Sequence, residues 1–445
     1  MIGFFANLLA RTAELAVSQV QSQQQQTQRK IPAVKMESTD EYRIDDTATL
    51  GRYWGKDSET FSIPEGIQKL GSFSFDGHKE LTEIEIPSTV QEIGYRTFYN
   101  CSNLTKIKVS PFNPYLCDID GILYDKLRQT LICCPPARTS IHIPASVTNI
   151  KYENAFATCH NLIDISIDRG NKKYTLVDGV LYERNALSLT KLVRCPADRI
   201  ALHIPDSITE ICYHAFEDCK NLMEIDIPSN VTTIGGYAFK NCHSLERVKF
   251  PKSLNAIGDS GFRICKSLKE VILPHGTETI IAGTFNECSS LEKIVIPDTV
   301  KFVGYIVSSC PNLKTMICHG VNVPMQDNPS PSGCLYMIVN KKYEEKIHSE
   351  IKYDILYQLH QMHPNDVKIE HAVKSAFVEI IKELTTAQNM DLVEKYFGSF
   401  SHLVTLENID EMIFHAIDSQ AYEIQVFLTN YKYEHFDFQA PEWKL

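Results

Sequence analysis

Residues 227–248 read IPSNVTTIGGYAFKNCHSLERV, and this stretch decides the fold because its pattern returns every 23 residues. Proline marks the period at five places, and phenylalanine and cysteine mark it at four places each. The prolines are Pro205, Pro228, Pro251, Pro274 and Pro297; the phenylalanines are Phe216, Phe239, Phe262 and Phe285; the cysteines are Cys219, Cys242, Cys265 and Cys288. A fixed period of this length indicates a solenoid, in which each repeat forms one coil and stacks on its neighbours.

The order of residues within one repeat predicts how a coil is built. The run L-x-x-I-x-I at residues 222–227 places alternate side chains on one face of a short strand. Pro228 ends this strand because proline has no N–H for the ladder. Gly235 suits a tight corner, and Phe239 is expected to fill the middle of the coil. A single coil cannot bury its apolar side, so we expect each strand to pair in parallel with the same strand of its neighbours.

The repeat is similar to a known family. The motif I-P-x-x-V-x-x-I-G-x-x-A-F-x-x-C-x-x-L-x-x-I, nearly intact at residues 227–248, resembles the BspA-type leucine-rich repeat. Two longer coils with the segments DGILY at residues 120–124 and DGVLY at residues 178–182 resemble the longer coils of that family. The resemblance covers roughly two thirds of the chain. It implies an interaction or adhesion surface and not a catalyst.

We therefore predict an α+β chain made of a mostly β, right-handed solenoid and a small all-α domain. The solenoid with its terminal cap is assigned to residues 60–362 and the helical domain to residues 363–445. Residues 1–59 are expected to hold a short amphipathic helix over residues 1–17, a glutamine-rich linker and an irregular lead-in. The helix is a candidate for peripheral contact with a membrane.

Apolar residues at helical spacing mark the C-terminal part of the chain. They predict helices at residues 343–362, 367–384, 390–397, 408–418 and 422–431. Residues 335–339 are expected to form a last strand. Asn408 is expected to cap the helix predicted at residues 408–418. The last two helices resemble an ankyrin-like helical pair, although the T-P-L-H signature of that repeat is absent.

The composition of the chain narrows the classes of function that it can have. The net charge of −11 argues against a general nucleic-acid-binding protein, because phosphate contacts require a basic patch. No apolar run is long enough for a transmembrane helix. Half of the 14 cysteines keep the register of the repeat, which favours buried thiols over a disulfide framework or a metal site. A reduced compartment is the simpler expectation, so a cytoplasmic location is favoured. The alternative is a cell-surface adhesin exported without a classical signal peptide.

Catalytic and cofactor motifs do not occur in the sequence. It contains no G-x-S-x-G, H-E-x-x-H, G-x-x-x-x-G-K-[ST] or G-x-G-x-x-G segment. We therefore expect no enzyme activity, no cofactor and no metal. The expected partner is a protein.

Charged residues recur at the outward positions of the predicted strands. Their signs tend to alternate from coil to coil, so Glu83 and Lys106 are expected to be neighbours, as are Asp226 and Lys249. This row is either a solvated face that keeps the strands in register or the docking face for a protein partner. The predicted partner-binding residues are Glu83, Glu85, Lys106, Lys108, Glu224, Asp226, Arg247, Lys249, Glu270, Ile272, Lys293 and Val295.

The outward positions become aliphatic toward the end of the repeats. Ile272, Val295 and Ile317 occupy the same position in three successive coils. Adjacent aliphatic side chains on an outward face indicate a covered surface. We expect the helical tail or a partner to cover them.

Overall fold

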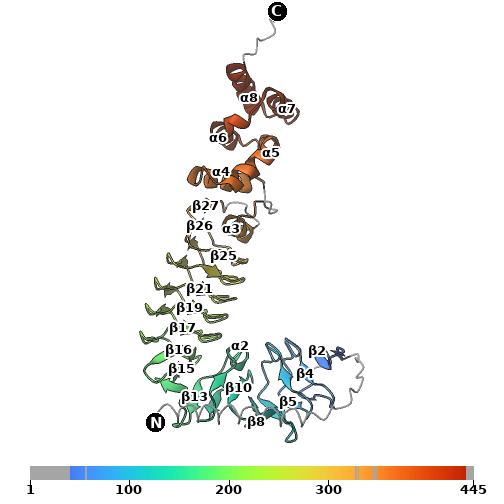
Figure 1. Cartoon of the computed structure of the whole chain (residues 1–445), viewed down its shortest axis with the longest axis vertical. Coiled ribbons are helices and arrows are strands. Elements are labelled where there is room, and N and C mark those ends of the chain that lie inside the picture. The colour runs from blue at the N-terminus through green and yellow to red at the C-terminus, as the bar shows by residue number, and fades with distance from the viewer. Residues whose placement is uncertain are drawn as a thin grey trace, which may run out of the picture. The chain divides into compact units, whose positions relative to one another are not determined.

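The computed structural model describes residues 41–55, 58–325, 328, 330–343, 347 and 349–436 (Figure 1). The repeats form a β-solenoid of about 12 turns with parallel strands, and helices follow it, which confirms the predicted fold class. The chain divides into two compact units, Met1–Lys126 and Leu127–Leu445, and each is described by itself. The predicted domain limits stay predictions. The helix predicted at residues 1–17 and the glutamine-rich linker lie outside the described residues.

The first unit contains three groups of strands. One sheet has the order β1-β2-β4-β6, a second has the order β3-β5-β7, and β8 and β9 form an antiparallel hairpin. The strands are β1 (Tyr42–Ile44), β2 (Thr49–Tyr53), β3 (Thr60–Ser62), β4 (Lys69–Leu70), β5 (Glu83–Ile86), β6 (Glu92–Ile93), β7 (Lys106–Val109), β8 (Leu116–Ile119) and β9 (Ile122–Asp125).

The start of this unit differs from the irregular lead-in that the sequence suggests. β1 and β2 form an antiparallel hairpin, and β2 pairs in parallel with β4 of the first coil. Leu50 and Tyr53 are buried, and the Tyr53 ring packs against Phe61 at 4.4 Å and Phe75 at 5.4 Å between centroids. Polar residues near Leu50 and Tyr53 obscure the strand pattern in the sequence. The hairpin supplies the N-terminal cap that an exposed first strand requires.

The second unit continues the repeat with two strands in each regular coil. A longer strand precedes the proline, and a two-residue strand precedes the next corner. The strands are β10 (Thr130–Cys133), β11 (Ser140–Ile143), β12 (Asn149–Ile150), β13 (Asp164–Ile167), β14 (Tyr174–Val177), β15 (Val180–Arg184), β16 (Leu189–Arg194), β17 (Glu210–Ile211), β18 (Glu224–Asp226), β19 (Thr233–Ile234), β20 (Arg247–Lys249), β21 (Ala256–Ile257), β22 (Glu270–Ile272), β23 (Thr279–Ile280), β24 (Lys293–Ile296), β25 (Phe302–Val303), β26 (Thr315–Cys318) and β27 (Val321–Val323). Corresponding strands of successive coils pair in parallel, as predicted.

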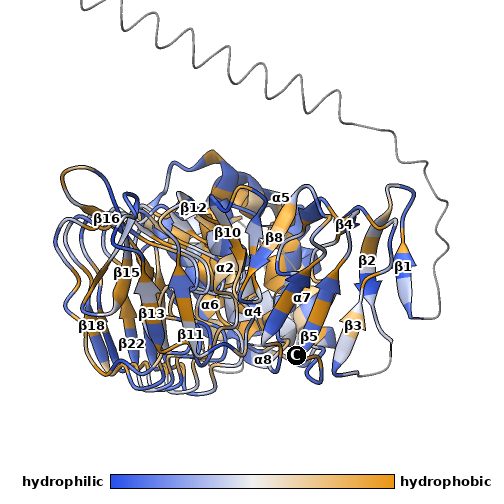
Figure 2. Ribbon diagram, turned by 90° about the horizontal axis from the view of Figure 1, so that it is seen from below, coloured by the Kyte–Doolittle hydropathy of each residue, from blue (hydrophilic) through white to orange (hydrophobic). Residues whose placement is uncertain are grey.

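Hydrophobic and hydrophilic residues alternate along the strands, so that each coil turns one side inward (Figure 2). Phe239 is fully buried, as predicted. Its ring stacks on Phe216 at 4.7 Å and on Phe262 at 4.8 Å, with interplanar angles of 6° and 5°. The core of the regular coils is therefore a column of parallel rings, one from each coil.

The two longer coils share one device at their start. Asn113 donates through its side-chain amide to the carbonyls of Pro87 and Val90 and accepts from two backbone N–H groups that follow it. Asn171 makes the equivalent four bonds in the second unit. Because both ends of the buried amide are satisfied, asparagine fits this position better than an apolar residue would.

Helices close the second unit. They are α3 (Pro331–Asn340), α4 (Ser349–Met362), α5 (Val367–Thr386), α6 (Met390–Phe400), the 3₁₀ turn η1 (Ser401–Leu403), α7 (Leu406–Asp418) and α8 (Tyr422–His435); α2 (Tyr152–Ala155) is a single turn inside the solenoid. The helices predicted at residues 367–384, 390–397, 408–418 and 422–431 are confirmed. The helix predicted at residues 343–362 begins later, at Ser349.

Two local predictions in this region are wrong. Residues 335–339 lie in α3 and not in a strand, because helical residues buried on every side give no periodicity that distinguishes the two structures. Asn408 does not cap α7. Thr405 is the cap, and its hydroxyl accepts from the N–H of Asn408 while the Asn408 side chain accepts from the N–H of Thr405.

Candidate interaction surface

The outward side chains of β5 and β7 in the first unit, and of β18, β20, β22, β24 and β26 in the second, are called the strand face. In the second unit Glu224 lies opposite Arg247, and Asp226 lies opposite Lys249, in parallel register. Glu224 and Arg247 form an ion pair, and Lys249 Nζ lies 3.9 Å from Asp226. The predicted alternation of charge is confirmed for these strands.

The next pair of strands changes from charged to apolar along its length. Glu270 lies opposite Lys293, with 2.7 Å between the charged atoms. Ile272 lies opposite Val295 in the same pair of strands.

The strand face of the first unit shows one difference from the expected pairing. Glu83 lies opposite Lys106 in register, as predicted, and Glu85 lies opposite Lys108. The ion pair nevertheless runs diagonally, from Lys108 Nζ to Glu83 at 2.6 Å. This hydrogen bond to Glu83 raises the pKa of Lys108. Register alone therefore does not determine which charges meet.

These ion pairs contribute little to stability. The side chains of Glu224 and Arg247 are both 63% exposed, and Asp226 and Lys249 are more exposed still. Pairs in such positions add little net stability, because water and salt screen the charges. The charged side chains of these pairs are therefore largely solvated.

An apolar hollow interrupts the charged row. The ladder of long strands is divided here, because β18 and β20 belong to one sheet and β22 begins another. A hollow of about 700 Å³ lies on this part of the face and is lined by Ile200, Met223, Val248 and Ile272 among charged side chains. Ile200, Met223 and Ile272 are 66%, 52% and 51% exposed.

Of these apolar residues, sequence reasoning found Ile272 and missed Ile200 and Met223. Met223 directly follows the repeat leucine, where the next coils carry Glu246, Lys269 and Glu292. A comparison of equivalent positions from coil to coil would have singled it out. Ile200 lies 23 residues before Met223, at the same position relative to the following Ile-Pro pair, so the same comparison would have found it.

The predicted aliphatic row exists. Ile272, Val295 and Ile317 lie side by side in register on β22, β24 and β26. The helical region closes the edge of this sheet, since Gln358 of α4 exchanges hydrogen bonds with the backbone of Asn322 on β27. It does not cover Ile272, which stays half exposed, whereas Val295 and Ile317 are half-buried.

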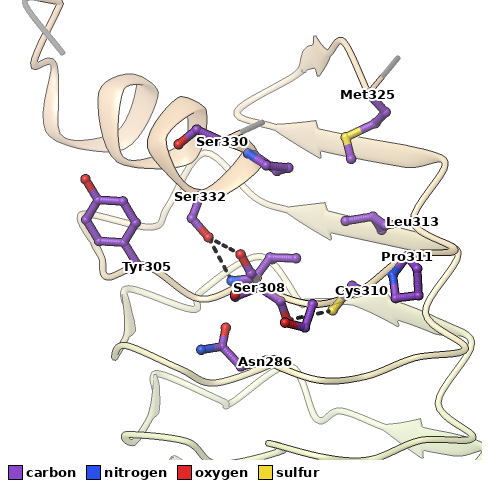
Figure 3. Close-up of a pocket in the computed structure, with 12 residues that line it drawn as sticks. Asn286, Tyr305, Ser308, Cys310, Pro311, Leu313, Met325, Ser330 and Ser332 are labelled. Atoms are coloured by element: carbon purple, nitrogen blue, oxygen red, sulfur yellow. Dashed lines mark hydrogen bonds between the residues drawn. The ribbon is translucent and has the colours of Figure 1, made fainter. Parts of the chain in front are cut away.

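A second hollow, of about 580 Å³, lies where the last coil meets α3 (Figure 3). Ser332 ties the two together, because its hydroxyl accepts from Val307 N–H at 2.9 Å and donates to Val307 C=O at 2.5 Å. Tyr305, Ser308 and Ser330 surround this bridge. The joint replaces the backbone contacts that a further coil would make.

A buried charged network, which sequence reasoning did not anticipate, joins three coils. The Glu217 carboxylate is fully buried and accepts from His214 Nδ1 at 2.7 Å, Lys240 Nζ at 3.2 Å and the N–H of Thr158 at 3.1 Å. Burial raises the pKa of Glu217, but His214, Lys240 and Arg194 outweigh that effect and hold the pKa below its usual range. Because these side chains are enclosed, the network is suited to fixing coils and not to reacting with a substrate.

The repeated cysteines also have a structural role. All 14 cysteines are free thiols, and most are buried. Burial raises the pKa of Cys101 and of Cys288 to about 12, so these thiols stay protonated. The described residues contain no group of three or more His, Cys, Asp or Glu side chains placed to hold a metal ion.

The comparison with protein families decides the identity of the repeat. The BspA type leucine rich repeat region matches six copies at residues 52–115, 131–186 and 197–314, which is more than half of the chain. The chain belongs to this family. Membership in this family favours a role in protein interaction or adhesion, and proteins with such repeats are generally non-enzymatic. BspA-type proteins are often associated with cell surfaces.

Several solved structures are similar to part of this chain. A leucine rich cell surface protein from Faecalibacterium prausnitzii is 26% identical over 63% of this chain and 93% of its own, with a TM-score of 0.38. The pneumococcal vaccine antigen PcpA is 19% identical over 63% of this chain and 70% of its own, with a TM-score of 0.39. A leucine-rich repeat protein from Bacteroides ovatus is 26% identical over 64% of this chain and 71% of its own, with a TM-score of 0.28.

A comparison with curated proteins found no significant match. Within the described ranges, none of the helices is both long enough and apolar enough to cross a lipid bilayer.

Proposed function

We propose that this BspA-type repeat protein is a non-catalytic scaffold that binds a protein partner on the strand face of its second unit. The observation that carries the proposal is the apolar hollow between β20 and β22. The side chains of Ile200, Met223 and Ile272 are exposed in this hollow, and charged side chains line it as well. An apolar centre with a polar rim is the usual anatomy of a protein–protein interface.

The charged residues and the hollow have different roles in this proposal. Arg247 pairs with Glu224, and Lys293 pairs with Glu270, so these charges are already satisfied without a partner. They orient an approaching protein and limit which proteins can bind. Met223 and Ile272 supply most of the binding free energy, because burying them removes apolar surface from water.

Affinity capture with matched variants tests this role. Three forms of the full chain are immobilised and exposed to an extract of the source cells. They are the wild type, the double variant Met223→Asp/Ile272→Asp and the control variant Leu187→Asp. Leu187 is 95% exposed and lies outside the strand face, so its variant adds a charge to an exposed apolar position elsewhere. We expect a protein bound by wild type and by Leu187→Asp to be lost from the double variant. Retention of the same proteins by the double variant contradicts the proposal.

Val295→Asp extends the test along the aliphatic row. Val295 lies beside Ile272 but is half-buried, so this change also reports on the sheet itself. If stability, solubility and partner binding all stay as in wild type, the row has no role as a covered surface.

A cell-surface adhesin is the second candidate, and the frequent surface association of this family favours it. The free thiols favour a reducing compartment instead, since disulfides form and persist in oxidising ones. Protease treatment of intact source cells separates the two. Digestion of this chain while a cytosolic marker survives supports the adhesin, and full protection supports the intracellular scaffold.

A further inference from the structure

The last two helices carry a second surface that is distinct from the strand face. α7 and α8 pack against each other and lie side by side in Figure 1. The buried side of the pair includes Ile409, Met412, Ile424 and Leu428. Both helices are therefore anchored by one face.

Large apolar side chains point to solvent from the other side of this pair. Phe414 and Ile417 end α7 and are 68% and 45% exposed; Tyr422 and Val426 begin α8 and are 68% and 59% exposed. Only the short turn after Asp418 separates the two groups in the chain, so the four exposed side chains lie at the same end of the helix pair. We call these four residues the α7–α8 patch. Exposed apolar side chains gathered in this way indicate a candidate binding surface.

The charge of the helix pair is strongly negative. From residue 406 to residue 435 the sequence has six carboxylates and one lysine. Asp410 is neutralised by Lys432, and Glu411 by Lys382. In the described part of the chain the other carboxylates are exposed and make no ion pair: these are Glu407, Asp418, Glu423 and Glu434.

We propose that the α7–α8 patch binds an amphipathic helix of a protein partner that carries lysine and arginine beside its apolar face. Leucine-like side chains of such a helix cover Phe414 and Val426, and its basic side chains meet Asp418 and Glu423. α7 and α8 are 13 and 14 residues long, so a partner helix of about 20 Å matches their length.

Charge excludes the other occupants. A second copy of the chain would bring one acidic rim against another. The segment 437–445, with sequence DFQAPEWKL, is itself net negative and so is not attracted to the rim. A membrane rich in anionic lipid is repelled for the same reason.

The test uses the full chain and a fluorescent 14-residue peptide of leucine and lysine arranged as an amphipathic helix. A peptide with glutamate in place of lysine is the charge control, and a shuffled leucine–lysine peptide is the amphipathicity control. We expect fluorescence anisotropy at physiological salt to show binding of the first peptide alone. Phe414→Ser/Val426→Ser should weaken this binding about tenfold or more, as for central apolar interface residues. Because both side chains are exposed, the helix content and melting temperature of this variant should equal those of wild type.

Two charge variants with the same net charge complete the test. Asp418→Lys/Glu423→Lys should abolish binding of the lysine peptide, whereas Asp46→Lys/Asp206→Lys, in exposed positions outside α7 and α8, should leave it unchanged. Unchanged binding by Phe414→Ser/Val426→Ser overturns the proposal, since charge alone would explain the affinity. A wild-type dimer in sedimentation velocity that this variant abolishes also overturns it, in favour of a second copy. The proposal is also overturned if the peptide binds only after residues 437–445 are removed, because the chain itself would then cover the α7–α8 patch.

Discussion

The thiol of Cys242 donates a hydrogen bond to the backbone carbonyl of Phe216, which lies one coil earlier at 3.1 Å. The same carbonyl also accepts from the N–H of Cys219. The bond recurs from Cys265 to Phe239 at 3.2 Å and from Cys288 to Phe262 at 3.3 Å. The cysteine of the repeat therefore links each coil to the one before it, beyond filling space as a small apolar residue.

Removal of this thiol donor should lower the free energy of unfolding by a measurable amount. Cys242→Ala loses both the packing of the thiol and its hydrogen bond, whereas Cys318→Ala loses packing alone, since buried Cys318 lies in β26 outside this ladder. We expect urea unfolding to show a greater loss of stability for Cys242→Ala, by about 1 kcal/mol, which is the usual net contribution of one hydrogen bond. Equal losses in the two variants would mean that the thiol acts only through its volume.

Truncation of a ring in the phenylalanine column should lower stability more than loss of the thiol does. Phe239→Ala should lower the free energy of unfolding by about 3–5 kcal/mol, because the stacked neighbours Phe216 and Phe262 cannot close the cavity without moving whole coils. Phe112→Ala, at an 85% exposed position, should change it by less than about 0.5 kcal/mol. Hydrogen exchange should place the lost protection in the coils next to Phe239, since solenoid stability depends on contacts between neighbours. Uniform loss along the chain would contradict this nearest-neighbour account.

The backbone of the repeat provides a stabilising substitution. Ile264 has a φ of +64°, and the equivalent residue of the preceding coil is Asn241, with a φ of +63°. A β-branched side chain is unfavourable in this left-handed conformation by roughly 1–2 kcal/mol, whereas asparagine adopts it more readily. Ile264→Asn should therefore raise the free energy of unfolding by up to about 1 kcal/mol. Ile281→Asn, which changes a partly exposed isoleucine without positive φ, should give no gain. A gain in both variants would mean that exchanging an apolar for a polar side chain, and not the backbone conformation, stabilises the fold.

The sequence was informative wherever a residue type is tied to one position of the coil. Phe239 and the cysteine ladder were predicted correctly because a 23-residue period places equivalent residues one above another. α5 and α6 were predicted because each buries one face and exposes the other, which leaves a helical period in the sequence. α3 lacks that contrast, since most of its side chains are buried, and its assignment as a strand was wrong.

Two features of the solenoid were much harder to predict. Glu217 and Lys240 look like solvated surface charges in the sequence, yet they form a buried pair because one charge stands above the other in successive coils. The hollow at Met223 likewise depends on where the ladder of strands divides. Neither a period nor a motif encodes that division.

The buried network predicts a specific dependence on pH. The pKa of Glu217 in the folded chain lies below the ordinary value of 4.5, so its ionised form adds stability above about pH 4.5. This contribution is lost as the pH falls from 4.5 toward the lower folded value, with a slope of up to about 1.4 kcal/mol per pH unit. Glu217→Gln should remove that part of the slope. At pH 7 it should also lower stability by about 3–5 kcal/mol, because the buried Lys240 then lacks its counter-charge.

A matched acid on the surface separates this network from a general effect of charge. Glu287→Gln removes a carboxylate that pairs with Arg263 at 2.5 Å, where both side chains are about 40% exposed. We expect this variant to lose about 0–1 kcal/mol at pH 7 and to keep the acid dependence of wild type. Urea unfolding of the three proteins between pH 7 and pH 3.5 measures both quantities. If Glu217→Gln unfolds in acid with the slope of wild type, other carboxylates control the acid stability. If its loss at pH 7 is no larger than that of Glu287→Gln, the ion pair with Lys240 does not hold the coils together.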